Sequence, residues 1–216
     1  TPLNAIIGFT GTLLMELPGP LTEDQREQLE LVRSSARHQL SLINDLLDLV
    51  KIESGKVVLK LVPVDSREVV REVFASLQPL ADTKGLSLTA DIPGEPAVIA
   101  TDRRALSQIL INLLSNAIKF TGKGGVRVAL RRGNDATELA VSDTGIGIPS
   151  AEQAQLFQPF ARIENADEER QEGTGLGLHL SRKLAELLHA QITVESEPGK
   201  GSTFTLTVPN PAPGGS

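Results

Sequence analysis

The sequence contains no cysteine among its 216 residues. Disulfide bonds, zinc sites built on thiolates and thiol nucleophiles are therefore excluded. No apolar run approaches the roughly 20 residues that a membrane-spanning helix needs, and no stretch resembles a signal peptide. The formal net charge of −6 argues against nucleic acid as the main partner. We expect one or two domains in the cytoplasm, either free or as the cytoplasmic part of a membrane-anchored protein, with no direct membrane segment in this chain.

Two common phosphate-binding fingerprints are also missing. Residues 122–125 (Gly-Lys-Gly-Gly) lack the frame of a Walker A loop, which ends in Gly-Lys-Ser/Thr. The pair Gly173 and Gly175, with Glu195 about 20 residues later, imitates a dinucleotide-binding fingerprint, but that fingerprint needs a strand immediately before the glycines. Residues 164–172 are instead a polar run without a strand pattern. We interpret this run as a mobile loop that ends at a helix start, where free backbone N–H groups can hold phosphate.

The first 54 residues have the pattern of two helices. The first is predicted to run from the N-terminus to about Leu17, where Pro18-Gly19-Pro20 stops it. Thr22 opens the second helix, and Gln25 completes a capping box. Apolar residues then recur with the heptad spacing of a coiled-coil seam: Leu29, Ala36, Leu40, Ile43, Leu47 and Val50. Two such hairpins can bury their seams by pairing into a four-helix bundle; the alternative is a hairpin packed on the rest of its own chain.

After Glu53-Ser54-Gly55-Lys56 the pattern changes to short strands alternating with helices. Strands are predicted at residues 57–64, 86–92, 97–100, 126–131, 138–141, 192–196 and 203–208. Helices are predicted at 65–84, from 102 through Asn116, from about 151, and at 175–188. We expect an α+β protein, with an N-terminal antiparallel helical hairpin (1–54, half of a dimeric four-helix bundle), a two-layer α/β sandwich domain (55–209) and a tail or linker (210–216).

Asp143 ends one of the predicted strands and is followed by Thr144-Gly145-Ile146-Gly147. Because glycine has no Cβ and tolerates φ > 0, Gly145 and Gly147 would let the main chain turn sharply against a flat ligand. The Asp143 carboxylate could then accept a hydrogen bond from an exocyclic amine. Taken alone, the stretch is equally good turn chemistry.

Asn112 and Asn116 lie four residues apart on a predicted helix, so their amides share one face, with Lys119 three residues further on. Amide oxygens suit a Mg²⁺ ion that is held jointly with phosphates, and a lysine suits the phosphate charge. The alternative is an amphipathic helix with a polar flank, which must explain why amides interrupt an apolar run.

The segments NLLSNAIKFT, DTGIGI, FQPF, GTGLGL and GSTF occur in this order, and they resemble the N, G1, F, G2 and G3 boxes in the ATP-binding region of bacterial sensor histidine kinases. Residues 1–9 resemble the end of that family's H box, so the resemblance covers nearly the whole chain. It implies a homodimeric kinase that binds ATP and Mg²⁺ and transfers the γ-phosphoryl group to a histidine of the hairpin. The phosphoryl group would then pass to an aspartate of a response regulator, and a phosphatase activity is left open.

The resemblance also implies a role for each matching residue. Asp143 matches the carboxylate that reads adenine, with Gly145 and Gly147 as the glycines that let the backbone approach the base. Asn116 matches the Mg²⁺ ligand and, with Lys119, a catalytic residue; Asn112 lies beside the phosphates. Thr1 matches a residue that positions water for phosphatase activity. The remaining matches are the anchors of a nucleotide lid, the lid's hinge and phosphate contacts, and a residue near the base: Phe157, Phe160, Gly173, Thr174, Gly175, Leu176, Gly177 and Thr203. The lid itself, residues 161–173, is expected to move.

The family's phosphoacceptor histidine is not among these residues. It stands four positions before the residue that Thr1 matches, so we expect it upstream, with a natural absence as the alternative. His38, His179 and His189 are predicted to be a solvated helix residue, a helix-surface residue and a helix-end residue. Two other functions stay open: a non-catalytic regulatory (pseudokinase) module that acts through its hairpin, and an ATPase of the topoisomerase or chaperone type. The sequence upstream of Thr1 would discriminate among the three.

Overall fold

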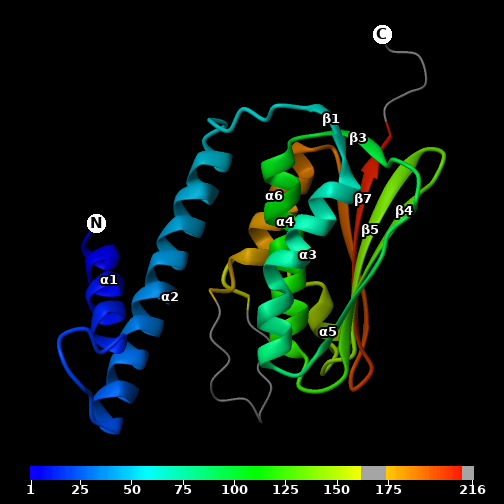
Figure 1. The fold of residues 1–216 in the computed structure, drawn as a ribbon. Coiled ribbons are helices and arrows are strands. Elements are labelled where there is room, and N and C mark those ends of the chain that lie inside the picture. The colour runs from blue at the N-terminus through cyan, green and yellow to red at the C-terminus, as the bar shows by residue number, and fades with distance from the viewer. Residues whose placement is uncertain (162–173, 211–216) are drawn as a thin grey trace.

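The computed structural model describes residues 1–161 and 174–210. A helical hairpin stands beside an α/β domain, and an extended linker crosses from the top of the second helix to the domain (Figure 1). The hairpin consists of α1 (Pro2–Leu14) and α2 (Glu23–Glu53), which pack against each other. The predicted α+β class is confirmed.

Thr22 caps α2 as predicted. Its side chain accepts a hydrogen bond from the Gln25 backbone N–H (3.3 Å), and the Gln25 side chain accepts one from the Thr22 N–H (3.0 Å). These reciprocal bonds satisfy donors that a helix start otherwise leaves unpaired. The end of α1 was predicted too late, since the helix stops at Leu14 rather than Leu17. Glu16 adopts a left-handed φ of 56°, which a helix cannot continue.

The α/β domain has two layers. Helices lie side by side on one face of a five-stranded sheet (Figure 1). The sheet order is β2-β4-β5-β7-β6; β2 pairs in parallel with β4, and all other neighbours are antiparallel. The strands are β2 (Ser87–Asp91), β4 (Gly125–Arg132), β5 (Ala136–Asp143), β6 (Gln191–Glu197) and β7 (Gly201–Pro209). The helices are α3 (Ser66–Thr83), α4 (Arg103–Phe120) and α6 (Gly177–Leu187).

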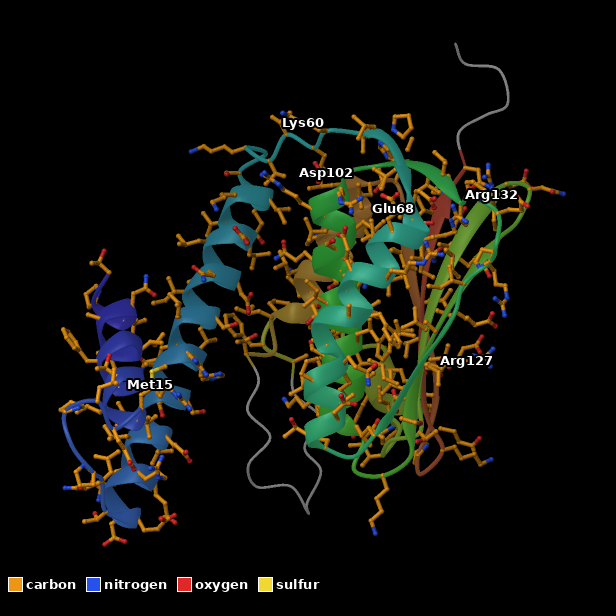
Figure 2. All side chains as sticks on the ribbon, viewed as in Figure 1. Met15, Lys60, Glu68, Asp102, Arg127 and Arg132 are labelled. Atoms are coloured by element: carbon orange, nitrogen blue, oxygen red, sulfur yellow. The ribbon has the colours of Figure 1, made fainter. Side chains whose placement is uncertain are left out.

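The core lies between the helices and the sheet. On β4 and β5 buried residues alternate with more exposed ones, because successive side chains of a strand point to opposite faces. The largest fully buried side chains include Ile109, Leu110, Leu113 and Leu114 of α4. Arg127 of β4 lies on the side of the sheet away from the helices (Figure 2), where it bonds Asp91 (2.7 Å). The sheet is therefore covered by helices on one side only.

Two predicted elements are shorter than expected. The strand expected at residues 57–64 begins only at Val62, because β1 (Val62–Asp65) exists where it can pair with β3 (Val98–Thr101), in a separate two-stranded sheet. The helix expected from about residue 151 is the single turn α5 (Ser150–Gln153). No helix in the described part of the chain is long and apolar enough to cross a membrane.

Asp102 joins the linker to α4. Its Oδ1 accepts hydrogen bonds from the backbone N–H groups of Arg104 (2.9 Å) and Ala105 (3.1 Å), which makes it the predicted N-cap of α4. Its Oδ2 accepts a further bond from the backbone N–H of Lys60 in the linker (2.9 Å). Lys60 and Asp102 lie next to each other above the first turn of α4 (Figure 2). One carboxylate thus fixes both the start of α4 and the end of the crossing from the hairpin.

Candidate functional site

Asn112 and Asn116 are half-buried on the α6 side of α4. The Asn116 Nδ2 donates to the Asn112 Oδ1 at 3.4 Å, and the Asn112 Nδ2 donates to the Ser181 Oγ of α6 at 2.8 Å. The two amides therefore form a chain of hydrogen bonds between the helices. The Asn116 Oδ1 makes no hydrogen bond to any residue that the structure describes, so it remains available as an oxygen ligand.

Asp143 stands at the end of β5, and its side chain is half-buried. Its Oδ1 accepts hydrogen bonds from the backbone N–H groups of Gly145 (2.8 Å) and Ser202 (3.3 Å). Burial raises the pKa of the Asp143 carboxyl above its ordinary value of 3.8, and the two backbone N–H groups oppose this rise. Its Oδ2 has no hydrogen-bond partner within residues 1–161 and 174–210. A ligand amine could donate to that oxygen.

The glycines after Asp143 let this loop press against neighbouring backbone. A Cβ at Gly145 would collide with the backbone oxygen of Phe120, the last residue of α4. Gly147 has a φ of +69°, and a Cβ there would collide with the backbone oxygen of Glu197. The Ile146 N–H also donates to the Phe120 oxygen, at 3.4 Å. The loop from Asp143 to Gly147 is therefore seated at the C-terminal end of the helix that carries the two asparagines.

The start of α6 approaches the same helix. A Cβ at Gly177, its first residue, would collide with the Asn112 Oδ1, so only glycine lets the backbone lie this close. Gly175 has a φ of +68° and lies against the backbone of Phe160. The Thr174 Oγ1 accepts a hydrogen bond from the Leu176 N–H at 3.1 Å, and Leu176 is buried. The predicted residues 174–177 thus form a turn beside Asn112, while Gly173 lies outside the described residues, as does nearly all of the expected lid.

Phe157 and Phe160 differ in their surroundings. Phe157 packs against the core, its backbone oxygen lies 2.8 Å from the His179 Nδ1, and the Arg182 guanidinium lies 5.6 Å from its ring. Phe160 is exposed (62%) with a φ of 62°. His179 is therefore half-buried and bonded at the start of α6 rather than a plain surface residue. His189 is exposed and ends α6 in a left-handed conformation (φ 55°), which agrees with its prediction as a helix-end residue.

Two predicted site residues lie apart from this arrangement. Thr203 pairs with Ser142 across β7 and β5, and its Oγ1 donates to the Ser142 Oγ at 2.9 Å. Because side chains alternate along a strand, Thr203 lies on the face opposite Asp143, so its side chain does not join that carboxylate. The backbone N–H of Ser202, a residue that the sequence analysis did not single out, donates to the Asp143 Oδ1. Thr1 is exposed at the start of α1, on the far side of the hairpin from α4 and α6 (Figure 1).

Lys119 lies in the last turn of α4, with its Nζ 4.7 Å from the centre of the Phe120 ring. A shallow surface pocket of about 430 Å³ lies along another stripe of α4. None of the predicted site residues lines that pocket; its lining is Arg103, Arg104, Ser107, Gln108 and Ile111. The convergence of the loop after β5, the Asn112 stripe and the start of α6 is therefore the better candidate site.

A polar contact joins the hairpin to this site. The Thr174 Oγ1 donates to the Asp45 Oδ2 of α2 at 3.3 Å, and α2 also packs against α6. Burial raises the pKa of Asp45 above 3.8, the hydrogen bond from Thr174 opposes that rise, and the nearby Asp48 charge adds to it. The same threonine hydroxyl therefore bonds α2 and caps the turn before α6.

Comparison with known proteins places this geometry in a family. A model of the His Kinase A (phospho-acceptor) domain matches residues 1–55. A model described as histidine kinase-, DNA gyrase B-, and HSP90-like ATPase matches residues 101–212. The second match covers more than half of the chain and contains the asparagine pair, Asp143 and the start of α6.

Individual relatives agree with these matches. The circadian input-output histidine kinase CikA of Synechococcus elongatus is 44% identical over 212 residues, which is 97% of this chain and 28% of CikA. The histidine protein kinase DivJ of Caulobacter vibrioides is 40% identical over 210 residues, 97% of this chain and 35% of DivJ. The crystal structure of full-length ShkA in complex with AMPPNP has a TM-score of 0.76 and 30% identity, and covers 96% of this chain and 42% of ShkA.

The chain spans well under half the length of these curated relatives. Both family models, the relatives and the fold nevertheless agree on one assignment. The helical hairpin matches the phosphoacceptor domain, and the α/β domain with its asparagine pair and glycine turns matches the ATPase. The chain belongs to the sensor histidine kinase family, with an ATPase domain of the type shared with DNA gyrase B and HSP90.

Proposed function

We propose that this chain is the dimerisation hairpin and catalytic ATP-binding domain of a protein-histidine kinase. It binds Mg·ATP and transfers the γ-phosphoryl group to a histidine of the hairpin, for relay to an aspartate of a response-regulator receiver domain. The boundaries proposed above, 1–54, 55–209 and 210–216, fit the end of α2 at Glu53 and the start of β1 at Val62. The proposal further includes a cytoplasmic location.

The observation that supports nucleotide binding most is the Asp143 carboxylate. One of its oxygens is held by backbone N–H groups, and the other is left for a ligand. A half-buried acceptor at the end of a strand, next to two glycines without room for a Cβ, suits the exocyclic amine and flat face of adenine. The AMPPNP bound in ShkA, a relative of the same fold at 30% identity, supports the same ligand class here.

The residues near Asp143 also fit a magnesium ion. No group of three or more His, Cys, Asp or Glu residues that could hold a metal exists in the described part of the chain. Mg²⁺ does not require one, because it keeps several waters and is held by few protein ligands together with substrate phosphates. The Asn116 Oδ1 is an oxygen of the required kind, since its amide nitrogen is already bonded to Asn112. The bound ion would neutralise charge on the phosphates.

Within this proposal the protein mainly positions the reactants. Asp143 selects and orients the base, Asn112 and Asn116 orient the phosphate end, and Lys119 adds a positive charge at the end of α4. In the transfer, a histidine nitrogen forms a bond to the γ-phosphorus while the bond from that phosphorus to the β,γ-bridging oxygen breaks and ADP leaves. This step needs alignment and charge stabilisation more than covalent chemistry by the enzyme, so amides, glycines and a lysine suffice.

A homodimer through the hairpin forms part of the proposal. The seam residues Ile43, Leu47 and Val50 are 48%, 51% and 53% exposed in the single chain, although they are apolar. Apolar seams of this spacing are buried when helices pair with a second copy. Among the exposed apolar residues of α1 are Ile6 and Phe9, on the helix that precedes the turn.

The direct test is phosphorylation with γ-labelled ATP. The 216-residue chain should bind ATP without labelling itself, because none of its three histidines occupies the acceptor position of the family. A form extended upstream by native residues that include the His-Glu pair should acquire an acid-labile label and lose it on Asn116→Ala. If the 216-residue chain is labelled, one of its own histidines is an acceptor. If the extended form binds ATP and stays unlabelled, the regulatory-module alternative is favoured instead.

A further inference from the structure

The Gln153 side chain joins two backbone segments that border the candidate site. Its Nε2 donates to the Ile148 oxygen, at the end of the loop after β5, and to the Ser196 oxygen near the end of β6, both at 2.9 Å. Backbone oxygens can only accept hydrogen bonds, and a side-chain NH₂ group carries two hydrogens, so these contacts fix the orientation of the amide and use both donors. Gln153 is half-buried, and Leu156, three residues later, lies in the core and anchors this part of the chain.

The same two segments hold the Asp143 carboxylate. Its Oδ1 accepts one bond from the Gly145 N–H, in the loop, and one from the Ser202 N–H, in β7. Ser202 lies directly opposite Ser196 of β6, and their hydroxyl oxygens are 2.9 Å apart. The Ile148 N–H donates to the Ser196 Oγ at 2.8 Å. The direction of the carboxylate therefore depends on how the loop is placed against β6 and β7.

The backbone contacts between the loop and these strands run through glycines. The Gly199 N–H donates to the Ile146 oxygen at 2.7 Å, and Gly147 lies against the backbone oxygen of Glu197. Gly147 and Gly199 have φ values of +69° and +77°. Because glycine has more conformational freedom than any other residue, contacts of this kind allow a close approach but restrain the local backbone weakly. Gln153 holds both segments from a third part of the chain and supplies the restraint that glycines do not.

We propose that Gln153 is a positioning residue for recognition of the nucleotide base. It acts through the loop and β6, and it holds them so that the Asp143 Oδ2 faces the exocyclic amine of adenine. A hydrogen bond weakens steeply as its donor, hydrogen and acceptor depart from a straight line, so a small shift of the loop weakens this bond. The inference rests on the proposed function, because it deepens the role of Asp143 in the same site.

The test isolates the part of the affinity that depends on the exocyclic amine. The dissociation constants of ATP and of purine riboside triphosphate, which lacks that amine, are measured calorimetrically, and their ratio is compared among variants. Wild type should prefer ATP by about 5–150-fold, the equivalent of about 1–3 kcal/mol. Gln153→Met keeps the length of the side chain and removes both donors. It should lower the preference at least about threefold, while the affinity for purine riboside triphosphate stays at the wild-type value.

Two further variants separate the donors from the bulk of the side chain. Gln153→Lys carries several donors at the end of a chain that is one bond longer, and it should restore the preference for ATP. Gln153→Glu places acceptors opposite the two backbone oxygens, and it should lower the preference at least as far as Gln153→Met does. Gln155→Met is the matched control, because Gln155 is an exposed glutamine two residues further along the chain, and it should leave the preference unchanged.

The outcomes distinguish this role from a structural one. An equal loss of affinity for both nucleotides in Gln153→Met would assign the side chain a structural role only, and an undiminished preference for ATP would also overturn the proposal. If wild type itself binds the two nucleotides equally well, the assignment of Asp143 to the base fails, and the role of Gln153 fails with it. That result is visible in wild type alone, before any variant is compared.

Discussion

The hairpin and the α/β domain differ in how far their apolar side chains are buried. In α1 and α2 the buried residues are Thr10, Ala36 and Leu49 alone, and many leucines, isoleucines and valines are about half exposed. In the α/β domain the leucines and isoleucines of α4 are almost completely covered, with Ile111 (43% exposed) as the exception. The domain therefore contains a core that can stabilise it alone, whereas the hairpin has an apolar surface without one. The exposed apolar side chains of the hairpin support the proposed pairing with a second copy.

The largest expected effect is on the core of the α/β domain. Leu113→Ala should lower the free energy of unfolding of the domain by about 2–5 kcal/mol, because the side chain is 1% exposed and its removal leaves a cavity. Urea denaturation followed by circular dichroism measures this loss. Leu31→Ala, at a residue of α2 that is 67% exposed, is the control and should change it little. Equal losses for the two variants would contradict the contrast between the regions.

The second effect is on association. Ile43→Asp places a charge in the seam and should convert a dimer into a single chain at tens of micromolar, because a buried unpaired charge is costly at an interface. Light scattering gives the mass directly. ATP affinity should be retained, since Ile43 is a half-exposed residue of α2 and belongs to none of the elements that carry the candidate site. A wild-type mass of one chain under the same conditions would refute the dimer.

The third effect separates stability from binding within the α/β domain. Asp143→Asn keeps an oxygen for the Gly145 and Ser202 N–H groups but presents NH₂ where adenine would donate. The free energy of ATP binding should weaken by about 1–3 kcal/mol, because the new side-chain NH₂ and the exocyclic amine of adenine are both donors and would face each other. Calorimetric titration checks this result, with Asp91→Asn on the solvent side of the sheet as control. Equal affinities for Asp143→Asn and wild type would remove Asp143 from the site.

The same variant should not be less stable than wild type. Burial raises the pKa of Asp143 in the folded state, so the folded protein binds this proton more tightly than the unfolded chain. Wild-type stability therefore falls as pH rises from the unfolded-state value of 3.8 through the raised folded-state value, and the penalty persists at neutral pH. Asparagine carries no such charge. A stability curve of Asp143→Asn that drops in parallel with wild type over that range would contradict this assignment.

The smallest effect concerns the contact between the two regions. A double-mutant cycle of Asp45→Ala and Thr174→Val should give a coupling energy of about 0.5–1.5 kcal/mol, the usual range for one hydrogen bond. Asp48→Ala, which removes an ion pair to Lys51 within α2, is the control and should show no coupling to Thr174. A coupling of zero would mean that α2 and the start of α6 are held by packing alone.

The elements that depend on neighbouring residues in the sequence could be predicted. The capping box at Thr22, the N-cap at Asp102 and the alternation in β4 and β5 follow from local backbone chemistry. The strand expected at residues 57–64 failed for most of its length because a strand also requires a partner, and the antiparallel partner β3 ends at Thr101, the residue opposite Val62. Features that depend on residues within one helix or strand can therefore be predicted from the sequence, whereas features that require two elements to pair cannot.

The residues of the candidate site likewise fall into those that the sequence predicted and those that it did not. Asn112, Asn116, Asp143 and the glycines were recognised as motifs, and the structure brings them around the C-terminal half of α4. Ser181 was missed because it lies 69 residues from Asn112 along the chain, and nothing near it in the sequence distinguishes it from a helix-capping or surface serine. A motif also does not state which face of its strand a residue occupies. The period-2 alternation of β7, with Phe204 buried, could have indicated that Thr203 lies on the face opposite Asp143.

The carboxylate that joins the linker to α4 behaves as a fixed joint. Burial raises the pKa of Asp102, and the N–H groups of Lys60, Ala105 and Arg104 lower it by more, so the pKa lies below 3.8. The stabilisation that such a carboxylate provides is fully present above its unfolded-state pKa and is lost only as pH falls through the lower folded-state value. At neutral pH protonation therefore cannot open the joint. From this joint α4 runs through the core of the α/β domain, and Asn116 lies about 20 Å along it at about 1.5 Å per residue. Because Ile109, Leu110 and Leu113 are buried along the way, the helix keeps Asp102 and Asn116 at a fixed separation, and the linker is anchored at the end of α4 away from the asparagine pair.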